Sequence, residues 1–458
     1  MHGEYVKAEE HIQKALAIAT EIGDKNRKAL CCSAQGTVLR SRGDYVKAEE
    51  FYNKAIAIRK EIGDRKGEAT TYANPGNLFQ SRGEYVKAEE YQQKALVIKT
   101  EIGDRQGIAE CYNNLGGVFQ IRGKYEKAEE FHEKALMIAK QDGYRRGEAL
   151  CYRCLGKVFK SQGEYIKAEE YFQKAITIGK EIGDKEVEAS CNGNLGSVFH
   201  CLGEYSRAEE YYEKSYTINK KLGHRQGEAS DYYHLGNVFQ SRGSYFKAEE
   251  YLQKALVIYK ELGDRQGEAC CYATLGNVFK SLGFYAKALE YCKKGLVISK
   301  AIGDRSNEGR AYEKMGIIFQ NIGECDKARE YLEEARVLAE GIGDRQGEAT
   351  GYGNLGTLFE SLGEYVKAEE YFCKTLLITK EIGDRQGEAS CYCSLGNLFQ
   401  FRGEYVKAKE YVEKAVSIYK QIGHREGEGT AYRSPGCVVR DLGEYGKAEG
   451  YIRKALEI

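Results

Sequence analysis

Three groups of residues have types and spacings that could carry chemistry. Gly351, Gly353 and Gly356 form the Gly-x-Gly-x-x-Gly pattern, which binds dinucleotide phosphates where it follows a strand and opens a helix. Cys151 and Cys154 form a Cys-x-x-Cys pair, a spacing used in zinc sites and in disulfide exchange. The seven histidines are scattered, and none recurs beside a fixed serine or carboxylate partner.

The surrounding sequence argues against all three kinds of chemistry. The glycine pattern lies where a helix is expected, and the same segment in another copy, residues 111–116, reads Cys-Tyr-Asn-Asn-Leu-Gly. Cys111, Cys151 and Cys191 share one repeat position, which is typical of a small buried core residue. We therefore predict no catalytic site, no metal site and no cofactor, and a protein that is not an enzyme.

These segments recur because the chain repeats every 40 residues without an insertion or deletion. Gly3 returns at every fortieth position up to Gly443, and Ala8 returns in the same way up to Ala448. A fixed period in this range indicates stacked supersecondary units, each of which buries its apolar face on the next. Such units build long binding surfaces.

Each repeat is predicted to contain two amphipathic helices. In the copy of residues 104–143, apolar residues recur at helical spacing over 112–119 and again over 125–138. Gly123 lies between them and is expected to turn the chain with a positive φ. Cys111 and its counterparts fall on the apolar face of the first helix, where we expect them to pack against the second.

The ends of the helices carry further signals. An Ile-Gly-Asp sequence ends most second helices, and its aspartate is expected to cap the next helix. Tyr144, His224 and His424 replace this aspartate and predict weaker caps. Pro75 and Pro435 lie inside first helices and predict local kinks, because proline removes a helical hydrogen bond.

Composition limits the classes of partner and the compartment. Lysine and arginine total 69, as do aspartate and glutamate, so the net charge is zero. This balance argues against a nucleic-acid partner and against binding to a membrane surface, and no apolar stretch is long enough for membrane insertion. Fifteen cysteines, an odd number, favour reduced thiols. Because a repeat begins at Gly3, we expect no signal peptide and a cytoplasmic protein.

The order of residues within each repeat resembles the tetratricopeptide repeat. The residues that carry the resemblance in one copy are Tyr112, Leu115, Gly116, Phe119, Gly123, Tyr125, Ala128, Phe131 and Ala135. The period of 40 exceeds the usual 34. This longer form is similar to the repeats of the LGN/Pins G-protein-signalling modulators, to kinesin light chain, and to long tandem arrays in invertebrates.

The resemblance covers the whole chain and implies its fold class. We expect an all-α, right-handed superhelical solenoid of antiparallel helix hairpins with about 11.5 repeats, forming one domain over residues 1–458. Neither end carries the polar cap of a solenoid, so we expect a fragment of a longer protein. Residues 1–23 would form a half repeat, and hairpins would start near residues 24, 64, 104, 144, 184, 224, 264, 304, 344, 384 and 424.

The resemblance also implies where a ligand would bind, because the first helix of each hairpin lines the concave groove in this family. In the copy from Asp104 the groove positions are Glu110, Asn113, Asn114, Gly117 and Gln120. These positions vary most between copies. Either selection for a ligand or neutral drift at exposed sites would produce this variation. Family members hold the backbone of a peptide with asparagines at one of these positions, here Asn74, Asn114, Asn194 and Asn354.

Basic residues are the second groove feature. Arg153, Lys157 and Lys160 are spaced i, i+4, i+7 and share one face of a first helix. Such a face could capture an acidic segment through charge-assisted hydrogen bonds. The remaining predicted groove residues are His200, His234, Lys280, Arg310 and Lys314.

The sequence therefore predicts a non-enzymatic protein-interaction scaffold that binds an extended, partly acidic peptide of a protein partner. The clamp with which some relatives hold chaperone tails lacks its basic residues, since Ala73, Leu150 and Cys154 stand there. Three alternatives stay open: a regulatory or sensor arm of a larger signalling protein, a polarity or spindle adaptor like the LGN/Pins modulators, and a spacer.

Overall fold

The structure, a computed structural model, describes residues 2–432 and 453. Within this part of the chain all regular structure is helical. The helices are α1 His2–Glu21, α2 Lys25–Ser41, α3 Tyr45–Glu61, α4 Arg65–Ser81, α5 Tyr85–Glu101, α6 Arg105–Ile121, α7 Tyr125–Gln141, α8 Arg145–Ser161, α9 Tyr165–Ile182, α10 Lys185–Cys201, α11 Tyr205–Leu222, α12 Arg225–Ser241, α13 Tyr245–Leu262, α14 Arg265–Ser281, α15 Tyr285–Ile302, α16 Arg305–Ile322, α17 Cys325–Ile342, α18 Arg345–Ser361, α19 Tyr365–Ile382, α20 Arg385–Phe401 and α21 Tyr405–Ile422.

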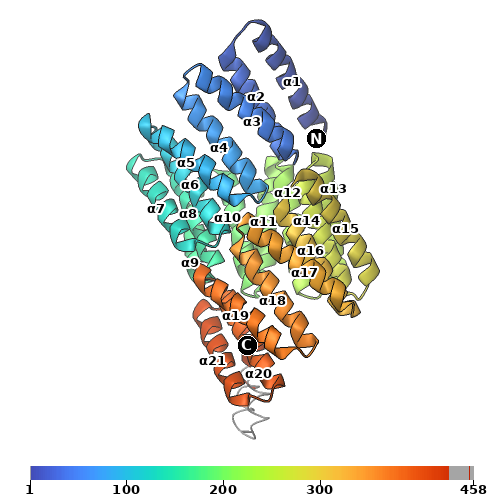
Figure 1. Cartoon of the computed structure of the whole chain (residues 1–458). Coiled ribbons are helices and arrows are strands. Elements are labelled where there is room, and N and C mark those ends of the chain that lie inside the picture. Colours follow the sequence, from blue (N-terminus) through green and yellow to red (C-terminus); the bar gives the residue numbers. More distant parts are fainter. Residues whose placement is uncertain (1, 433–452, 454–458) are drawn as a thin grey trace.

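The helices pair into antiparallel hairpins, with even-numbered first helices and odd-numbered second helices from α2 to α21 (Figure 1). Glycine allows the two helices of a hairpin to approach closely. A Cβ atom on Gly156 would lie 2.8 Å from Cε1 of Phe172, so only glycine fits there. Aromatic rings close the same interface, as where Phe119 stacks on Phe131 with centroids 5.2 Å apart.

The helix ends follow the predicted signals with one exception. Asp104 accepts a hydrogen bond from the amide of Gly107 at 3.0 Å, whereas Tyr144 and His224 make no side-chain cap. The prediction was wrong for His424, because its Nδ1 accepts from the Gly427 amide at 2.8 Å. An imidazole nitrogen without a proton can cap a helix just as a carboxylate does.

The two proline predictions have different outcomes. Helix α4 contains Pro75 and has the same length as α6, so the chain stays helical on both sides of the proline. Pro435 lies outside the described residues.

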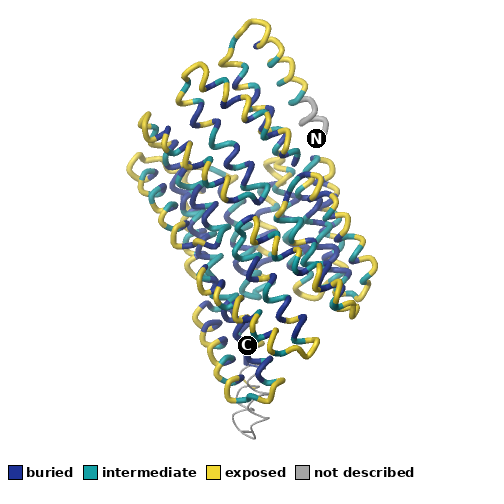
Figure 2. Tube along the Cα trace, in the orientation of Figure 1, coloured by how far each residue is buried: buried dark blue, intermediate teal, exposed yellow. Residues whose placement is uncertain are grey.

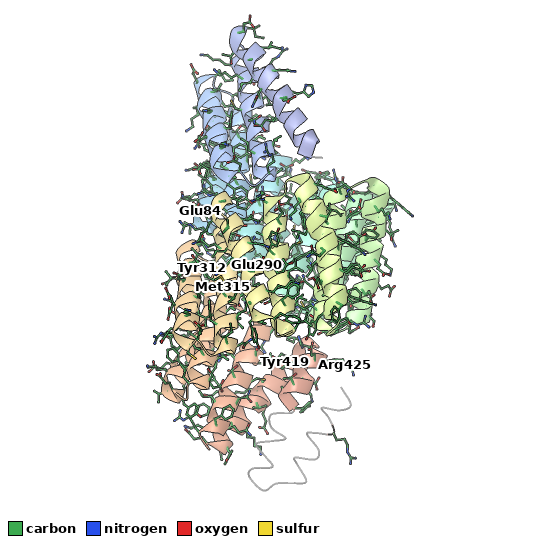
Figure 3. The ribbon with its side chains drawn as sticks, turned by 90° about the vertical axis from the view of Figure 1, so that its right-hand side faces the viewer. Glu84, Glu290, Tyr312, Met315, Tyr419 and Arg425 are labelled. Carbon is green, nitrogen blue, oxygen red and sulfur yellow. The ribbon has the colours of Figure 1, made fainter. Side chains whose placement is uncertain are left out.

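The hairpins wind into a superhelix in which the first turn, α1 to α11, touches the second turn, α12 to α21 (Figure 1). Tyr45 Oη donates a hydrogen bond to Gln266 Oε1 at 3.1 Å, and Tyr205 Oη donates to Glu426 Oε2 at 2.7 Å. Each pair is 221 residues apart, which at 40 residues per repeat is about five and a half hairpins. In the side view of Figure 3, Glu84 of the first turn lies near Tyr312 of the second, and both line one surface pocket.

Buried residues continue from each hairpin to the next along the whole coil (Figure 2). None of the helices in the described part of the chain is long and apolar enough to cross a membrane.

Candidate binding pocket between the superhelical turns

A pocket of about 560 Å³ lies inside the coil, between its two turns. The first turn contributes residues of α4, α5, α6, α7 and α8, and the second turn contributes residues of α16, α17 and α18. Most of the wall therefore comes from first helices, where the family resemblance places the groove. Three of the five predicted groove positions of α6 lie on it, namely Asn113, Gly117 and Gln120.

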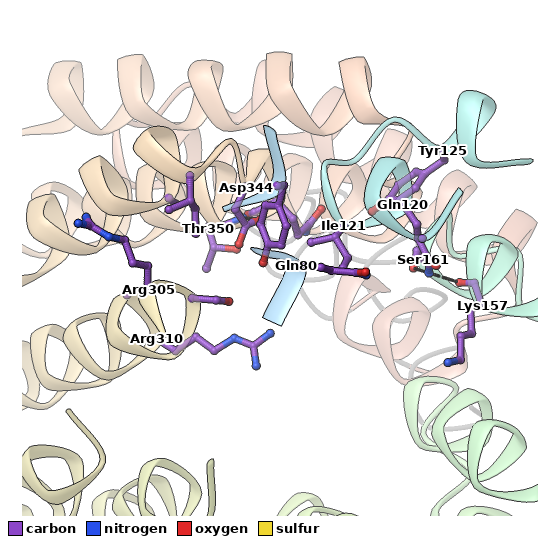
Figure 4. A pocket seen from close by; sticks show the side chains of 18 of the residues that line it. Gln80, Gln120, Ile121, Tyr125, Lys157, Ser161, Arg305, Arg310, Asp344 and Thr350 are labelled. Carbon is purple, nitrogen blue, oxygen red and sulfur yellow. Dashed lines mark hydrogen bonds between the residues drawn. The ribbon is translucent and has the colours of Figure 1, made fainter. Parts of the chain in front are cut away.

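Each of the two turns contributes a basic side chain to the pocket wall. Lys157 of α8 and Arg310 of α16 both line it, and Figure 4 shows their side chains reaching into the same open space from opposite sides. These two residues are 153 positions apart in the chain, so only the closing of the superhelix brings them to one site.

Groove positions are basic although the chain is neutral. We define the inner-face positions as the equivalents of Glu110, Asn113, Asn114, Gly117 and Gln120 in the ten hairpins α2 to α21. They hold seven basic residues and three acidic ones. None of the seven forms an ion pair with a residue that the structure describes. The basic residues are Arg40, Arg153, Lys157, Lys160, Lys280, Arg310 and Lys314.

The basic residues of α8 point across to the next repeat. Arg153 Nη1 donates to Ser190 Oγ at 2.7 Å, and Lys160 Nζ donates to Ser197 Oγ at 2.9 Å. Both hydroxyls belong to α10, and neither neutralises the charge. Burial lowers the pKa of Lys157 below its usual range, and the positive charges of Arg153 and Lys160 lower it further.

A second cluster lies on α14 and α16. Lys280 and Lys314 are half-buried. Burial lowers the pKa of Lys314, with further lowering by Arg310 and Lys280 that the carboxylate of Glu313 opposes. Like charges held together in this way gain stability from any anion that binds between them.

The predicted histidines extend the α8 cluster. His200 Nε2 lies 2.8 Å from Ser241 Oγ, and the His234 ring stacks on Tyr212 with centroids 5.2 Å apart. Burial lowers the pKa of His234 to about 4, and the charge of Lys160 adds to this effect. His234 is therefore neutral at neutral pH and offers a hydrogen bond, not a charge.

The four predicted asparagines are half-buried, and three of them have partners within the chain. The amide of Asn194 donates to the Ser190 carbonyl at 2.8 Å, and that of Asn354 donates to Glu313 Oε1 at 3.2 Å. Asn114 donates to Gln92 Oε1 at 3.3 Å, and Asn74 occupies the equivalent place on α4. These contacts leave the other polar atoms of each amide for a ligand.

The sequence reasoning missed three charged residues of the pocket wall. Glu313 occupies an inner-face position, so the repeat register alone could have identified it. Asp344 and Arg305 come from the starts of α18 and α16, and they face the pocket because the turns stack. No local signal marks them. Asp344 accepts a hydrogen bond from the Gly347 amide at 2.8 Å, as a helix cap does.

The cysteines and glycines that suggested chemistry have structural roles. Burial raises the pKa of the Cys111 thiol to about 11 and that of Cys151 to about 12, which keeps both protonated. The Gly-x-Gly-x-x-Gly segment lies inside α18, and its Gly356 packs against Phe372. No cluster of potential metal ligands occurs in the described part of the chain.

The comparisons with known proteins agree with this architecture. The model of the tetratricopeptide repeat family matches residues 2–61, 67–141, 148–221, 228–301, 274–341, 307–381, 347–421 and 388–458. No curated protein matches the sequence.

Three solved structures are similar to this chain. A Rap protein complexed with competence and sporulation factor is 17% identical, with 82% of this chain and 99% of that chain covered and a TM-score of 0.48. The apo quorum sensor NprR from B. thuringiensis is 13% identical, with coverages of 79% and 99% and a TM-score of 0.46. A signal transduction ATPase with a tetratricopeptide repeat sensor, from Pyrococcus horikoshii, is 17% identical, with coverages of 74% and 53% and a TM-score of 0.44.

Proposed function

The chain belongs to the tetratricopeptide repeat family, and we propose that it is a non-enzymatic scaffold that binds an extended acidic peptide inside its superhelix. One observation supports this proposal above the others. Seven cations occupy inner-face positions without an ion-pair partner among the described residues, in a chain whose net charge is zero.

Many basic residues elsewhere in the chain, unlike the seven inner-face ones, form ion pairs. Arg145, at the start of α8, pairs with Glu148 at 2.6 Å, and Lys134, on a second helix, pairs with Glu130 at 2.5 Å. Many cations of the helix ends and the second helices are neutralised in this way. The inner-face cations therefore favour a negatively charged ligand, and side chains that already donate to serines keep their charge available.

The geometry also favours an extended ligand. Lys157 and Arg310 face one pocket from two turns, while Lys280 and Lys314 continue the basic surface along α14 and α16. A main chain that passes along this surface could hydrogen-bond to the inner-face asparagines, because an amide side chain donates and accepts. Acidic side chains on it would meet the cations.

The test is a titration of a fluorescein-labelled polyglutamate peptide, followed by anisotropy. Charge reversal of α8, with Arg153→Glu, Lys157→Glu and Lys160→Glu combined, should weaken binding by about tenfold or more, since charged hydrogen bonds contribute about 1.5–3 kcal/mol each. Arg310→Glu should weaken it as well if one peptide contacts both turns.

The matched control reverses three exposed lysines away from the pocket that form no ion pair with any described residue: Lys66→Glu, Lys221→Glu and Lys293→Glu. This variant has the same net charge as the α8 variant and should keep most of the affinity. Equal losses in both variants would attribute the binding to bulk charge, and unchanged binding in the α8 variant would remove these cations from the proposal.

A further inference from the structure

One apolar position of the repeat exists in two environments. It is the last residue of each second helix or the residue after it, directly before the glycine. In the first turn it is 36–59% exposed at Ile22, Ile62, Ile102, Ile182 and Leu222, and one copy has the exposed Asp142 instead. In the second turn it is 4–7% exposed, at Leu262, Ile302, Ile342, Ile382 and Ile422. The local sequences are nearly the same, so a contact from outside the repeat makes the difference.

The contacting residues lie in the loops that join the two helices of each hairpin in the first superhelical turn. A Cβ atom on Gly43 would lie 3.5 Å from Cγ2 of Ile302, and one on Gly123 would lie 2.7 Å from Cγ2 of Ile382. The same glycines have φ values of 79° and 71°, a backbone conformation that disfavours a side chain at both positions. At Gly123 the isoleucine also leaves no room for a Cβ atom, whereas at Gly43 the isoleucine lies at van der Waals distance.

The tyrosine two residues after each of these glycines completes the contact. Tyr45 and Tyr125 of the first turn are buried, and Tyr45 Oη donates to Gln266 in the second turn. The Arg305 amide also donates to the Arg82 carbonyl at 3.2 Å, so main chain joins the two turns directly. Isoleucine and glutamine on one edge thus fit glycine and tyrosine on the other.

Among the residues that the structure describes, each outer edge of the 458-residue coil leaves one half of this contact uncovered. The N-terminal edge, defined by Ile22, Ile62, Ile102, Ile182 and Leu222, presents the isoleucine half. The C-terminal edge presents the glycine half, because a Cβ atom on Gly243, Gly283, Gly363 or Gly403 would have no described atom within 4 Å. The tyrosines that follow these glycines are only half-buried, and Phe284, Leu362 and Phe401 beside them are exposed.

We propose that a second copy of this chain stacks on the coil head to tail, with its N-terminal edge on the C-terminal edge of the first copy. The interface would repeat the contact that already joins the two turns within one chain. Its two surfaces differ, so the contact is heterologous and leaves one free edge of each kind at the ends. Such stacking adds copies one after another and does not stop at a symmetric dimer. Large exposed apolar residues gathered along an edge are typical of protein interfaces.

The experiment is sedimentation velocity on the 458-residue chain from micromolar to hundreds of micromolar concentration. The unmodified chain should grow in mass by about twofold or more as the concentration rises. The N-edge variant, Ile102→Asp, Ile182→Asp and Leu222→Asp, should stay monomeric. The control variant, Val257→Asp, Val297→Asp and Leu377→Asp, changes exposed apolar residues of the second helices away from the edges and should still associate.

Mixing separates head-to-tail stacking from other kinds of association. A C-edge variant, Phe284→Asp, Leu362→Asp and Phe401→Asp, should also be monomeric alone. An equimolar mixture of the N-edge and C-edge variants retains one intact edge of each kind and should form a dimer and nothing larger. Circular dichroism checks that both variants stay helical. A monomeric unmodified chain, edge variants that associate like the unmodified chain, or a mixture that stays monomeric would each overturn the proposal.

Discussion

Asp231 shows how a single residue can depart from the scaffold around it. Its repeat position holds the buried cysteines Cys111, Cys191 and Cys271 in other copies. Asp231 is equally buried, and its carboxyl accepts a hydrogen bond from Asn219 Nδ2 at 2.7 Å. Burial raises its pKa from 3.8 to about 6, which the hydrogen bonds from Asn219 and Ser215 only partly offset.

This shift predicts a pH dependence of stability. The folded-state pKa lies above the unfolded value, so the contribution of Asp231 is fully present below pH 3.8 and is lost as the pH rises through about 6. Asp231→Asn removes the titration and should raise the free energy of unfolding at pH 7.5 by roughly 1–3 kcal/mol, with little gain at pH 4. Urea denaturation at both pH values measures this. A gain that is the same at both would contradict the assignment, and Glu170→Gln, at an exposed carboxylate, is the control.

At the scale of the element, the hairpins follow from local sequence. Glycine at each turn, aspartate at the caps of most first helices and one apolar stripe per helix are short-range signals, and the structure confirms the helices that they predict. Helix α4 is an exception to the rule that proline interrupts a helix. Pro75 removes a main-chain hydrogen-bond donor, yet the helix stays continuous.

We expect Pro75→Leu to stabilise the chain by about 1–3 kcal/mol, since proline costs about 3 kcal/mol in a helix interior and the equivalent positions hold the buried leucines Leu115 and Leu155. In a solenoid each repeat contacts its neighbours, so the gain should be largest near α4. Hydrogen exchange measured by mass spectrometry would show slower exchange in α4 and α5. Unchanged exchange there would mean that α4 accommodates the proline at little cost.

At the scale of the whole molecule, prediction from sequence reached its limit. The sequence predicted the solenoid and the inner-face positions, and Asn113, Gly117 and Gln120 do line the pocket. It could not place Lys157 opposite Arg310. The number of hairpins in a turn depends on a small rotation per repeat, which accumulates over five to six hairpins and which no single residue encodes. The same closure buries Ile342 and leaves Ile102 exposed, although both precede Gly-Asp.

Because this repeat position is buried in the second turn and exposed in the first, the same substitution can be made in both environments. Replacing Ile302, Ile342 and Ile382 by aspartate places carboxylates in the contact between the turns, where burying an unpaired charge is unfavourable. We expect the coil to open, with a larger radius of gyration in small-angle X-ray scattering from dilute solution, and a weaker affinity for the polyglutamate peptide because the pocket needs both turns. The same replacement at Ile62, Ile102 and Ile182 changes the same repeat position where it is exposed, and should leave the radius of gyration unchanged. If the two variants scatter alike, the contact between turns does not hold the superhelix closed, and the pocket must depend on the curvature of the hairpin stack alone.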